Sequence, residues 1–253
     1  MANSTKYFIG NWKMFGIPSS FKIIERIQSY FSADKRNNSK YKIIIAPPFN
    51  LLQDFSKRLK KRGILISAQN CFHKDNFGAY TGNISPFMIK KMGINYTIIG
   101  HSENRALGEN EKNLEEKVYN ALKNKLNIIF CIGENMREKK NNKTMIVLKS
   151  QISKVLKKKY NFKKILIAYE PIWSIGSGKV PSDKELKKIL IFLKKFVKRK
   201  FRVRYNPKII YGGSVDKKNI NNFKSINELD GFLIGGASKS SKNFIDILRE
   251  FYK

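Results

Sequence analysis

The chain of 253 residues is poor in the side chains that most often bind metals or form disulfides, with only two cysteines and two histidines. Cys71 and Cys131 lie far apart without metal-ligand neighbours, so neither a disulfide framework nor a metal site is predicted. No stretch approaches the roughly 20 apolar residues of a membrane span. The first residues, MANSTKYFIGNWKM, fit no secretory signal. We therefore expect a soluble, cytoplasmic protein.

Acidic residues are also scarce: 19 Asp and Glu stand against 51 Lys and Arg, which gives a formal net charge of +32. The basic residues recur along the chain, separated by apolar runs, in SKRLKKRG (56–63), REKKNNKT (137–144), KVLKKKY (154–160) and KKFVKRKFRVR (194–204). Between 186 and 197, apolar residues follow helical spacing with lysines between them, which is typical of solvated helix backs. No motif combines basic and stacking aromatic residues, so we expect no specific nucleic-acid partner and no membrane partner. The charge would still favour anionic substrates.

Short β-branched runs recur eight times, at 6–13, 41–47, 64–70, 95–100, 126–133, 164–170, 208–213 and 229–236. The segments between them mostly carry helical periodicity, as at 17–32, 49–61, 105–124, 146–157 and 182–200. Continuous apolar strands alternating with amphipathic helices indicate a parallel sheet covered by helices. Eight such units without a linker predict an α/β fold, a single (β/α)8 TIM barrel domain over residues 1–253. A doubly wound open sheet is the alternative.

Polar residues and glycines follow the predicted strands. A barrel places its active site at the carboxyl ends of its strands. The residues found there are Asn11, Lys13, Gln69, Asn70, His101, Glu134, Glu170, Ser214, Gly235 and Gly236. A histidine taken alone would be interpreted as a structural residue satisfied by hydrogen bonds. Its place among these residues predicts that His101 belongs to a site.

Three of these loops are rich in glycine: SIGSGK (174–179), YGGS (211–214) and IGGAS (234–238). Glycine often serves only the backbone conformation of a turn. The last two loops, however, follow consecutive strands near the end of the barrel, where the phosphate site of such barrels lies. Backbone N–H groups and a helix N-terminus there would hold a phosphate dianion.

The segment AYEPIWSIGSGKVPSDKE (168–185) combines a candidate base with a candidate lid. Glu170 ends an apolar strand, where burial would raise its pKa and make it a better base. Pairing with a surface lysine is the structural alternative. Glycines permit movement of the loop, while a capping box of Ser182 and Glu185 would fix the next helix. Pro181 restricts Val180 to extended conformations, which would affect lid opening.

These motifs resemble the triosephosphate isomerase family over essentially the whole chain. The matching stretches are GNWKM (10–14), AQNC (68–71), GAYTGNIS (78–85), IIGHSENR (98–105), CIGE (131–134), AYEPIWSIGSGK (168–179), YGGSV (211–215) and DGFLIGGAS (230–238). The resemblance implies interconversion of dihydroxyacetone phosphate and D-glyceraldehyde 3-phosphate through an enediolate, in glycolysis or gluconeogenesis. It implies no cofactor.

The resemblance also implies a role for each site residue. Glu170 would take the proton from the substrate carbon, neutral His101 would donate a hydrogen bond to the oxyanion, and Lys13 would add positive charge. Asn11 would help to position the oxyanion. Glu103 would anchor Lys13, and Ser102 would hold Glu170 while the lid is open. The residues expected to bind the phosphate through backbone N–H groups are Gly176, Ser214, Gly235 and Gly236. The closed lid would exclude water and suppress loss of phosphate from the intermediate.

A homodimer is implied as well, formed through loop 72–82, which would carry Thr81 to the Asn11 and Lys13 of the partner. The chain departs from the family at two positions of this contact, where Asn83 and Asn104 replace an acid and a base. We expect the dimer to persist through packing of the loop, because paired charges repay only part of their desolvation cost. We also expect association to tighten as salt rises, because salt screens the like charge of the two chains.

Three alternatives remain. Another phosphate-binding barrel enzyme would not need Lys13, His101 and Glu170 together. A non-catalytic phosphate-binding barrel scaffold would have no use for intact catalytic residues. A basic nucleic-acid or membrane binder is supported by net charge alone.

Overall fold

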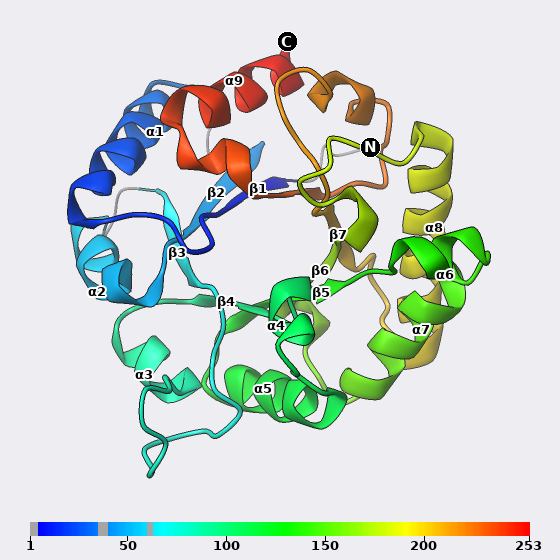
Figure 1. Ribbon diagram of the computed structural model, residues 1–253, viewed down its shortest axis with the longest axis horizontal. Coiled ribbons are helices and arrows are strands. Elements are labelled where there is room, and N and C mark those ends of the chain that lie inside the picture. The colour runs from blue at the N-terminus through cyan, green and yellow to red at the C-terminus, as the bar shows by residue number, and fades with distance from the viewer. Residues whose placement is uncertain (1–4, 35–39, 60–62) are drawn as a thin grey trace.

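Eight parallel strands close into a barrel in the order of the sequence (Figure 1). The computed structural model describes residues 5–34, 40–59 and 63–253. The strands are β1 (Lys6–Asn11), β2 (Tyr41–Ala46), β3 (Leu65–Ala68), β4 (Tyr96–Ile99), β5 (Asn127–Ile132), β6 (Ile165–Tyr169), β7 (Lys208–Tyr211) and β8 (Gly231–Ile234). Closure of β1 onto β8 confirms the predicted TIM barrel and excludes the doubly wound sheet.

The seam between β1 and β8 depends on a glycine. Gly231 pairs with Tyr7 and has φ +147°, a conformation that L side chains rarely adopt. A Cβ at this position would come within 2.1 Å of the carbonyl oxygen of Tyr7. The two strands therefore approach closely enough to pair only because residue 231 has no side chain.

Alternating strand residues divide the core into two parts. On β1, Phe8 packs in the large cluster between strands and helices, while Ile9 belongs to the smaller cluster inside the barrel. The same alternation on β2 places Ile43 and Ile45 in the large cluster and Ile44 in the small one. Period-2 alternation puts neighbouring side chains on opposite faces of a strand. Because both faces of each strand are buried, the strand sequences are continuous runs of apolar residues.

A ring of helices surrounds the barrel (Figure 1). The helices are α1 (Phe21–Ala33), α2 (Phe49–Arg58), α3 (Pro86–Lys91), α4 (Ser102–Ala106), α5 (Glu111–Lys123), α6 (Met136–Lys140), α7 (Thr144–Val155), α8 (Asp183–Phe201) and α9 (Ser241–Tyr252). The predicted helix at 49–61 ends at Arg58 in the structure, and its residues 60 and 61 lie outside the described residues. In the described part of the chain, no helix has the length and apolar character needed to cross a membrane.

The prediction of one helix over 105–124 was wrong, because this segment contains parts of two. Gly108 has φ +96°, which ends α4, and the Asn110 side chain accepts a hydrogen bond from the backbone N–H of Asn113 to cap α5. The short α4 therefore begins directly after β4. Its N-terminus is aimed at the carboxyl end of the barrel, where the site lies.

Candidate active site

All the residues predicted to act on substrate meet at one cavity at the carboxyl ends of the strands. The cavity has a volume of about 440 Å³. Its lining includes Asn11, Lys13, His101, Glu170, Gly176, Ser214, Gly235 and Gly236. The two predicted supporting residues, Ser102 and Glu103, form the first turn of α4 beside it. Residues separated by more than 200 positions thus share one site because parallel strands end at one face.

Lys13 is held in an unusual backbone conformation. Its φ of +55° lies in the left-handed region, which costs a non-glycine residue about 1 to 2 kcal/mol. Two polar side chains fix it there: the Asn11 side-chain oxygen accepts from the Lys13 backbone N–H at 3.1 Å, and the Gln69 amide donates to the Lys13 carbonyl at 2.9 Å. The same Gln69 amide donates to the Ala46 carbonyl at 2.8 Å. The Lys13 ammonium lies 2.6 Å from the Glu103 carboxylate.

The hydrogen bonds of His101 define which of its two ring nitrogens can donate. It is the N-cap residue of α4, and its Nδ1 accepts a hydrogen bond from the backbone N–H of Glu103 at 3.2 Å. A ring nitrogen that accepts carries no proton, so a neutral His101 carries its proton on Nε2. Nε2 lies 3.5 Å from Glu170 Oε1, on the cavity side of the ring. The helix N-terminus therefore orients His101 with Nε2 toward the cavity as its hydrogen-bond donor.

Glu170 is a buried carboxylate, with 3% of its surface exposed. It follows β6, and its backbone N–H donates to the Ile132 carbonyl at 2.7 Å. Burial raises the pKa of Glu170, against the opposing charge of His101 and Lys13. Its Oε2 atom has no hydrogen-bond partner among the described residues. Such a carboxylate is poorly solvated when ionised and is therefore a stronger base than an exposed one.

Two glycines make the space that Glu170 occupies. A Cβ on Gly212 would meet the Glu170 Cγ at 2.5 Å, and a Cβ on Gly133 would meet the Glu170 carbonyl oxygen at 1.8 Å. Any side chain at either position would displace the carboxylate or its backbone. These glycines were not singled out as partners of Glu170 from the sequence, because nothing local marks a close approach between segments 40 residues apart.

The predicted lid lies against the loop after β7. The Gly178 backbone N–H donates to the Ser214 hydroxyl at 3.1 Å, and that hydroxyl donates to the Ser174 carbonyl at 2.6 Å. At its start, the Trp173 indole donates to Glu134 at 2.9 Å. Gly176 and Gly178 have positive φ of 67° and 73°, which places the lid's two glycines where other residues would be strained.

The capping box predicted at the end of the lid is half present. The Ser182 hydroxyl accepts from the Glu185 backbone N–H at 3.3 Å and caps α8. The Glu185 carboxylate instead pairs with Lys139 at 2.9 Å. Lys139 also lies 3.6 Å from the centre of the Trp173 ring. The side chain of Glu185 therefore links the lid's far end to α6 rather than closing the cap.

The glycine loops contribute a cradle of backbone to the same cavity. Gly236 opens the short 3-10 helix η5 (Gly236–Lys239), Gly235 caps it, and Ser214 also lines the cavity. Lys239, which sequence reasoning missed, also lines the cavity and lies 5.3 Å from the centre of the Phe15 ring. A second ammonium group therefore stands beside the cradle. The available signal was a lysine three residues after the glycine pair, but in a chain so rich in lysine this position does not stand out.

A metal site is not formed by the described residues, which contain no group of three His, Cys, Asp or Glu side chains placed to hold an ion. Each group gathered at the cavity is instead a proton acceptor, a hydrogen-bond donor or a fixed positive charge. This set is suited to moving a proton while stabilising negative charge on oxygen.

Comparison with known proteins agrees with this geometry. The family model described as triosephosphate isomerase matches residues 6–251. The triosephosphate isomerases of Thermodesulfovibrio yellowstonii and Yarrowia lipolytica are both 37% identical to the chain; the alignments cover 96% and 97% of it and 98% of each relative. The crystal structure of triosephosphate isomerase from Bartonella henselae superposes with a TM-score of 0.88 at 32% identity, covering 98% of this chain and 99% of that one. The chain belongs to the triosephosphate isomerase family.

Proposed function

We propose that this cavity interconverts dihydroxyacetone phosphate and D-glyceraldehyde 3-phosphate, with Glu170 as the base, His101 as the hydrogen-bond donor and Lys13 as the fixed positive charge. The observation that carries the proposal is the approach of Glu170 Oε1 to His101 Nε2 at 3.5 Å in a cavity that also holds the Lys13 side chain. A substrate that lies against both side chains would present a carbon to the base and the neighbouring oxygen to the donor.

The proton moves in two steps in this proposal. The Glu170 carboxylate takes a proton from the carbon beside the carbonyl, and negative charge develops on the carbonyl oxygen. His101 Nε2–H and the Lys13 ammonium stabilise that oxygen, while Asn11 fixes the Lys13 backbone. The proton of the neighbouring hydroxyl group then passes to the former carbonyl oxygen, relayed by His101, and Glu170 returns its own proton to the former carbonyl carbon, so that the carbonyl and hydroxyl groups exchange places. Because every step is a proton transfer, the chain's own residues supply all the groups needed.

Phosphate binding orients the substrate for these steps. We assign it to the backbone N–H groups of Gly176, Ser214, Gly235 and Gly236, which line the same cavity as the base. In this proposal the lid closes over the cavity, and the hydrogen bond from Gly178 to Ser214 holds it to the loop after β7. Water excluded by the lid cannot solvate the enediolate, so water does not weaken the interactions of His101 and Lys13 with its oxygen. The closed lid also suppresses loss of phosphate from the intermediate. Ser102 remains the proposed partner of Glu170 when the lid opens.

A coupled isomerisation assay on Glu170→Ala tests the assignment. The side chain reaches the cavity from a loop, so the variant should fold, as circular dichroism would verify. Activity should fall by at least 10²- to 10⁴-fold, the usual contribution of a positioned base. Equal activity of the two proteins would refute the role of Glu170. Inactivity of both, with phosphate binding retained, would instead support the alternative of a non-catalytic phosphate-binding scaffold.

We also propose that the chain acts as a homodimer through loop 72–82. Large apolar side chains are exposed on this loop, beside it and after β1: Phe77 is 75%, Leu107 87% and Met14 98% exposed. A second copy would remove this apolar surface from water. Asn83 and Asn104 line one hollow beside the loop, where they provide amide groups in place of an ion pair.

Sedimentation tests the dimer. A dimer at micromolar protein that tightens as salt rises is expected, because the like charges of two +32 chains are screened. A stable monomer at that concentration would contradict the proposal. We further propose that residues 1–253 work as one domain in the cytoplasm, in glycolysis or gluconeogenesis, without a nucleic-acid or membrane partner.

A further inference from the structure

One lysine of α6 contacts both ends of the lid, which runs between Trp173 and Ser182. The Lys139 ammonium lies 3.6 Å from the centre of the Trp173 ring, where the lid begins. It also lies 2.9 and 3.2 Å from the two carboxylate oxygens of Glu185, in the first turn of α8. Ser182 caps that turn by accepting from the Glu185 backbone N–H. A single side chain therefore links the segment that enters the lid to the segment that leaves it.

Lys139 reaches these groups from a helix that is itself fixed. A capping box begins α6: the Asn135 side chain accepts from the Glu138 backbone N–H at 2.9 Å, and the Glu138 carboxylate accepts from the Asn135 backbone N–H at 2.8 Å. The paired side chains of Lys139 and Glu185 are 26% and 36% exposed. The ion pair is thus partly shielded from water and anchored at its α6 end.

Lys139 also supports Trp173 through the carboxylate that binds its indole. The Trp173 indole donates to Glu134 Oε1 at 2.9 Å, and Glu134 is fully buried. Burial raises the pKa of Glu134, and the hydrogen bond from Trp173 and the positive charge of Lys139 oppose that shift. An ionised carboxylate is the stronger acceptor. Lys139 therefore acts on Trp173 both at the face of its ring and by favouring the ionised form of its acceptor.

The tip of the lid depends on the placement of its two ends. Residues 176–179 are exposed, whereas Ser174 and Pro181 near the ends are buried. The tip is bonded to the barrel by the Gly178 backbone N–H, which donates to the Ser214 hydroxyl at 3.1 Å. A segment with so little buried surface has a low local stability. Movement of either end would therefore release the tip from Ser214.

We propose that Lys139 is a positioning residue for the lid, which it holds against Ser214 by linking the two lid ends. This inference rests on the proposed function, because it concerns the time during which the cavity holds the enediolate. If the lid opens then, the enediolate charge forms a new carbonyl, the bond from carbon to the phosphate oxygen breaks, and phosphate leaves with the electron pair. The remaining enol tautomerises to a 2-oxoaldehyde. Lys139 therefore limits the loss of phosphate by acting on the lid.

Two measurements on Lys139→Met test the proposal, because methionine removes the ammonium and keeps most of the side-chain length. Hydrogen exchange of the lid amides, followed by mass spectrometry on the unliganded protein, reports opening, since the Gly178 N–H is bonded to Ser214 in the closed lid. Phosphate released per isomerisation reports opening during turnover. Both should rise roughly three- to thirtyfold, the change that corresponds to the usual strengths of an exposed ion pair and a cation–π contact together. Exchange in the barrel strands should not change.

Three companion variants separate the two contacts of Lys139. Glu185→Gln removes only the ion pair, so both quantities should rise less, by roughly two- to fivefold. Lys139→Arg should stay within about twofold of the wild type, because a guanidinium keeps the charge, pairs with a carboxylate and stacks on an aromatic ring. Lys139→Met/Glu185→Gln should match Lys139→Met, because Glu185 acts through Lys139.

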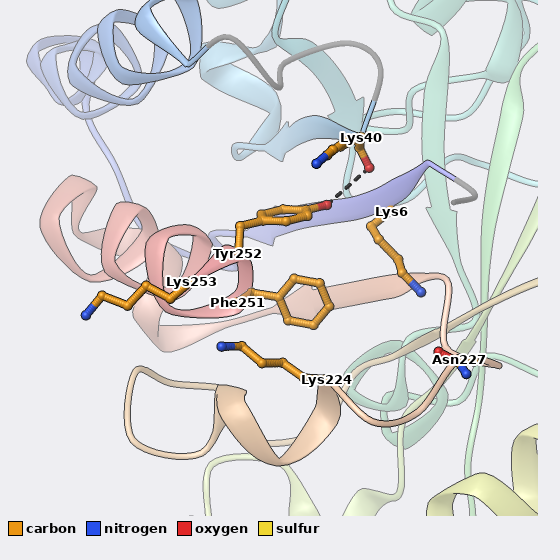
Figure 2. A pocket seen from close by; sticks show the side chains of 7 residues that line it. All are labelled: Lys6, Lys40, Lys224, Asn227, Phe251, Tyr252 and Lys253. Atoms are coloured by element: carbon orange, nitrogen blue, oxygen red, sulfur yellow. Dashed lines mark hydrogen bonds between the residues drawn. The ribbon is translucent and has the colours of Figure 1, made fainter. Parts of the chain in front are cut away.

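The control variant lies in a lysine pocket at the opposite end of the barrel from the active site. The lining of this pocket includes Lys6, Lys40, Lys224 and Phe251 (Figure 2). Lys6 begins β1 and Lys40 directly precedes β2, so the pocket faces the amino ends of the strands. In Figure 2 the Phe251 ring lies between the side chains of Lys6 and Lys224. Lys224→Met removes an exposed ammonium beside an aromatic ring, as Lys139→Met does, and should change neither measurement.

Several results would overturn the proposal. Wild-type values for Lys139→Met would show that Lys139 does not hold the lid, and equal changes in Lys224→Met would attribute the effect to net charge. A defect in Lys139→Arg as large as that in Lys139→Met would rule out the positive charge as the cause. Unchanged values for Glu185→Gln would show that Lys139 holds only one end. A wild type without isomerase activity would instead refute the proposed function, and exchange of the lid amides would still decide the role of Lys139.

Discussion

Replacing Gln69 with methionine should impair catalysis although Gln69 lies outside the set of residues assigned to substrate. Its amide donates to the carbonyls of Lys13 and Ala46 at 2.9 and 2.8 Å. Methionine preserves the length of the side chain and removes both donors. Each lost hydrogen bond costs about 1 kcal/mol net, so the free energy of unfolding should fall by about 2 kcal/mol.

The catalytic effect follows from the strain at Lys13. Its left-handed backbone costs about 1 to 2 kcal/mol, and without Gln69 that cost is no longer offset by a bond to its carbonyl. Lys13 should then leave its productive position for part of the time. At about 1.4 kcal/mol per factor of ten, kcat/KM should fall roughly five- to thirtyfold.

Steady-state kinetics well below the unfolding temperature, with stability measured in urea, provides the assay. Ser56→Ala is the control, because it removes one hydrogen bond, to the Met92 carbonyl at 3.2 Å, far from the cavity. It should lose about 1 kcal/mol of stability and keep its kcat/KM. If Gln69→Met loses stability as expected but retains kcat/KM within threefold, Gln69 does not act through Lys13.

Four further predictions concern the base, the phosphate site and the core. The raised pKa of Glu170 should make kcat/KM fall with acidification at a pH above the ordinary glutamate range of about 4.3, as a pH profile would show. Because folded Glu170 holds its proton more tightly than the unfolded chain does, its ionisation opposes folding as pH rises. Glu170→Gln should therefore unfold at higher urea than wild type at neutral pH, with the gap closing in acid; a constant gap would contradict the shift. Lys239→Met should raise KM severalfold with little change in kcat, and an unchanged KM would remove Lys239 from substrate binding. Leu193→Ala, in the fully buried face of α8, should cost about 2 to 5 kcal/mol in urea unfolding, and a smaller loss would mean that the core collapses around the cavity.

The barrel was predictable because its pattern is local and repeated. Each strand is an apolar run buried on both faces, and the lysines between apolar residues of α8 mark its solvent side. The same reasoning failed for the segment 105–124, which contains parts of two helices. Its periodicity continues through Gly108, whose positive φ ends one helix before Asn110 begins the next. Hydrophobic periodicity indicates which side of a helix is buried, but it does not reveal a short break between two helices.

The site was predictable in part for a similar reason. Lys13, His101 and Glu170 all follow apolar runs, and a parallel barrel brings the ends of such runs together. The sequence alone thus determined that these three side chains share the cavity. It did not determine how Gln69 fixes the Lys13 backbone, or that Lys239 lines the cavity.

Tertiary structure alone decided the features that depend on contact between distant segments. The Glu103 backbone N–H selects the donor nitrogen of His101, and the missing Cβ of Gly212 leaves room for the Glu170 carboxylate. The lysine pocket at the amino ends of the strands is likewise assembled from both ends of the chain. Local sequence encodes burial and backbone preference over a few residues. Donor direction and close approach are set by neighbours in space, which only the closed barrel defines.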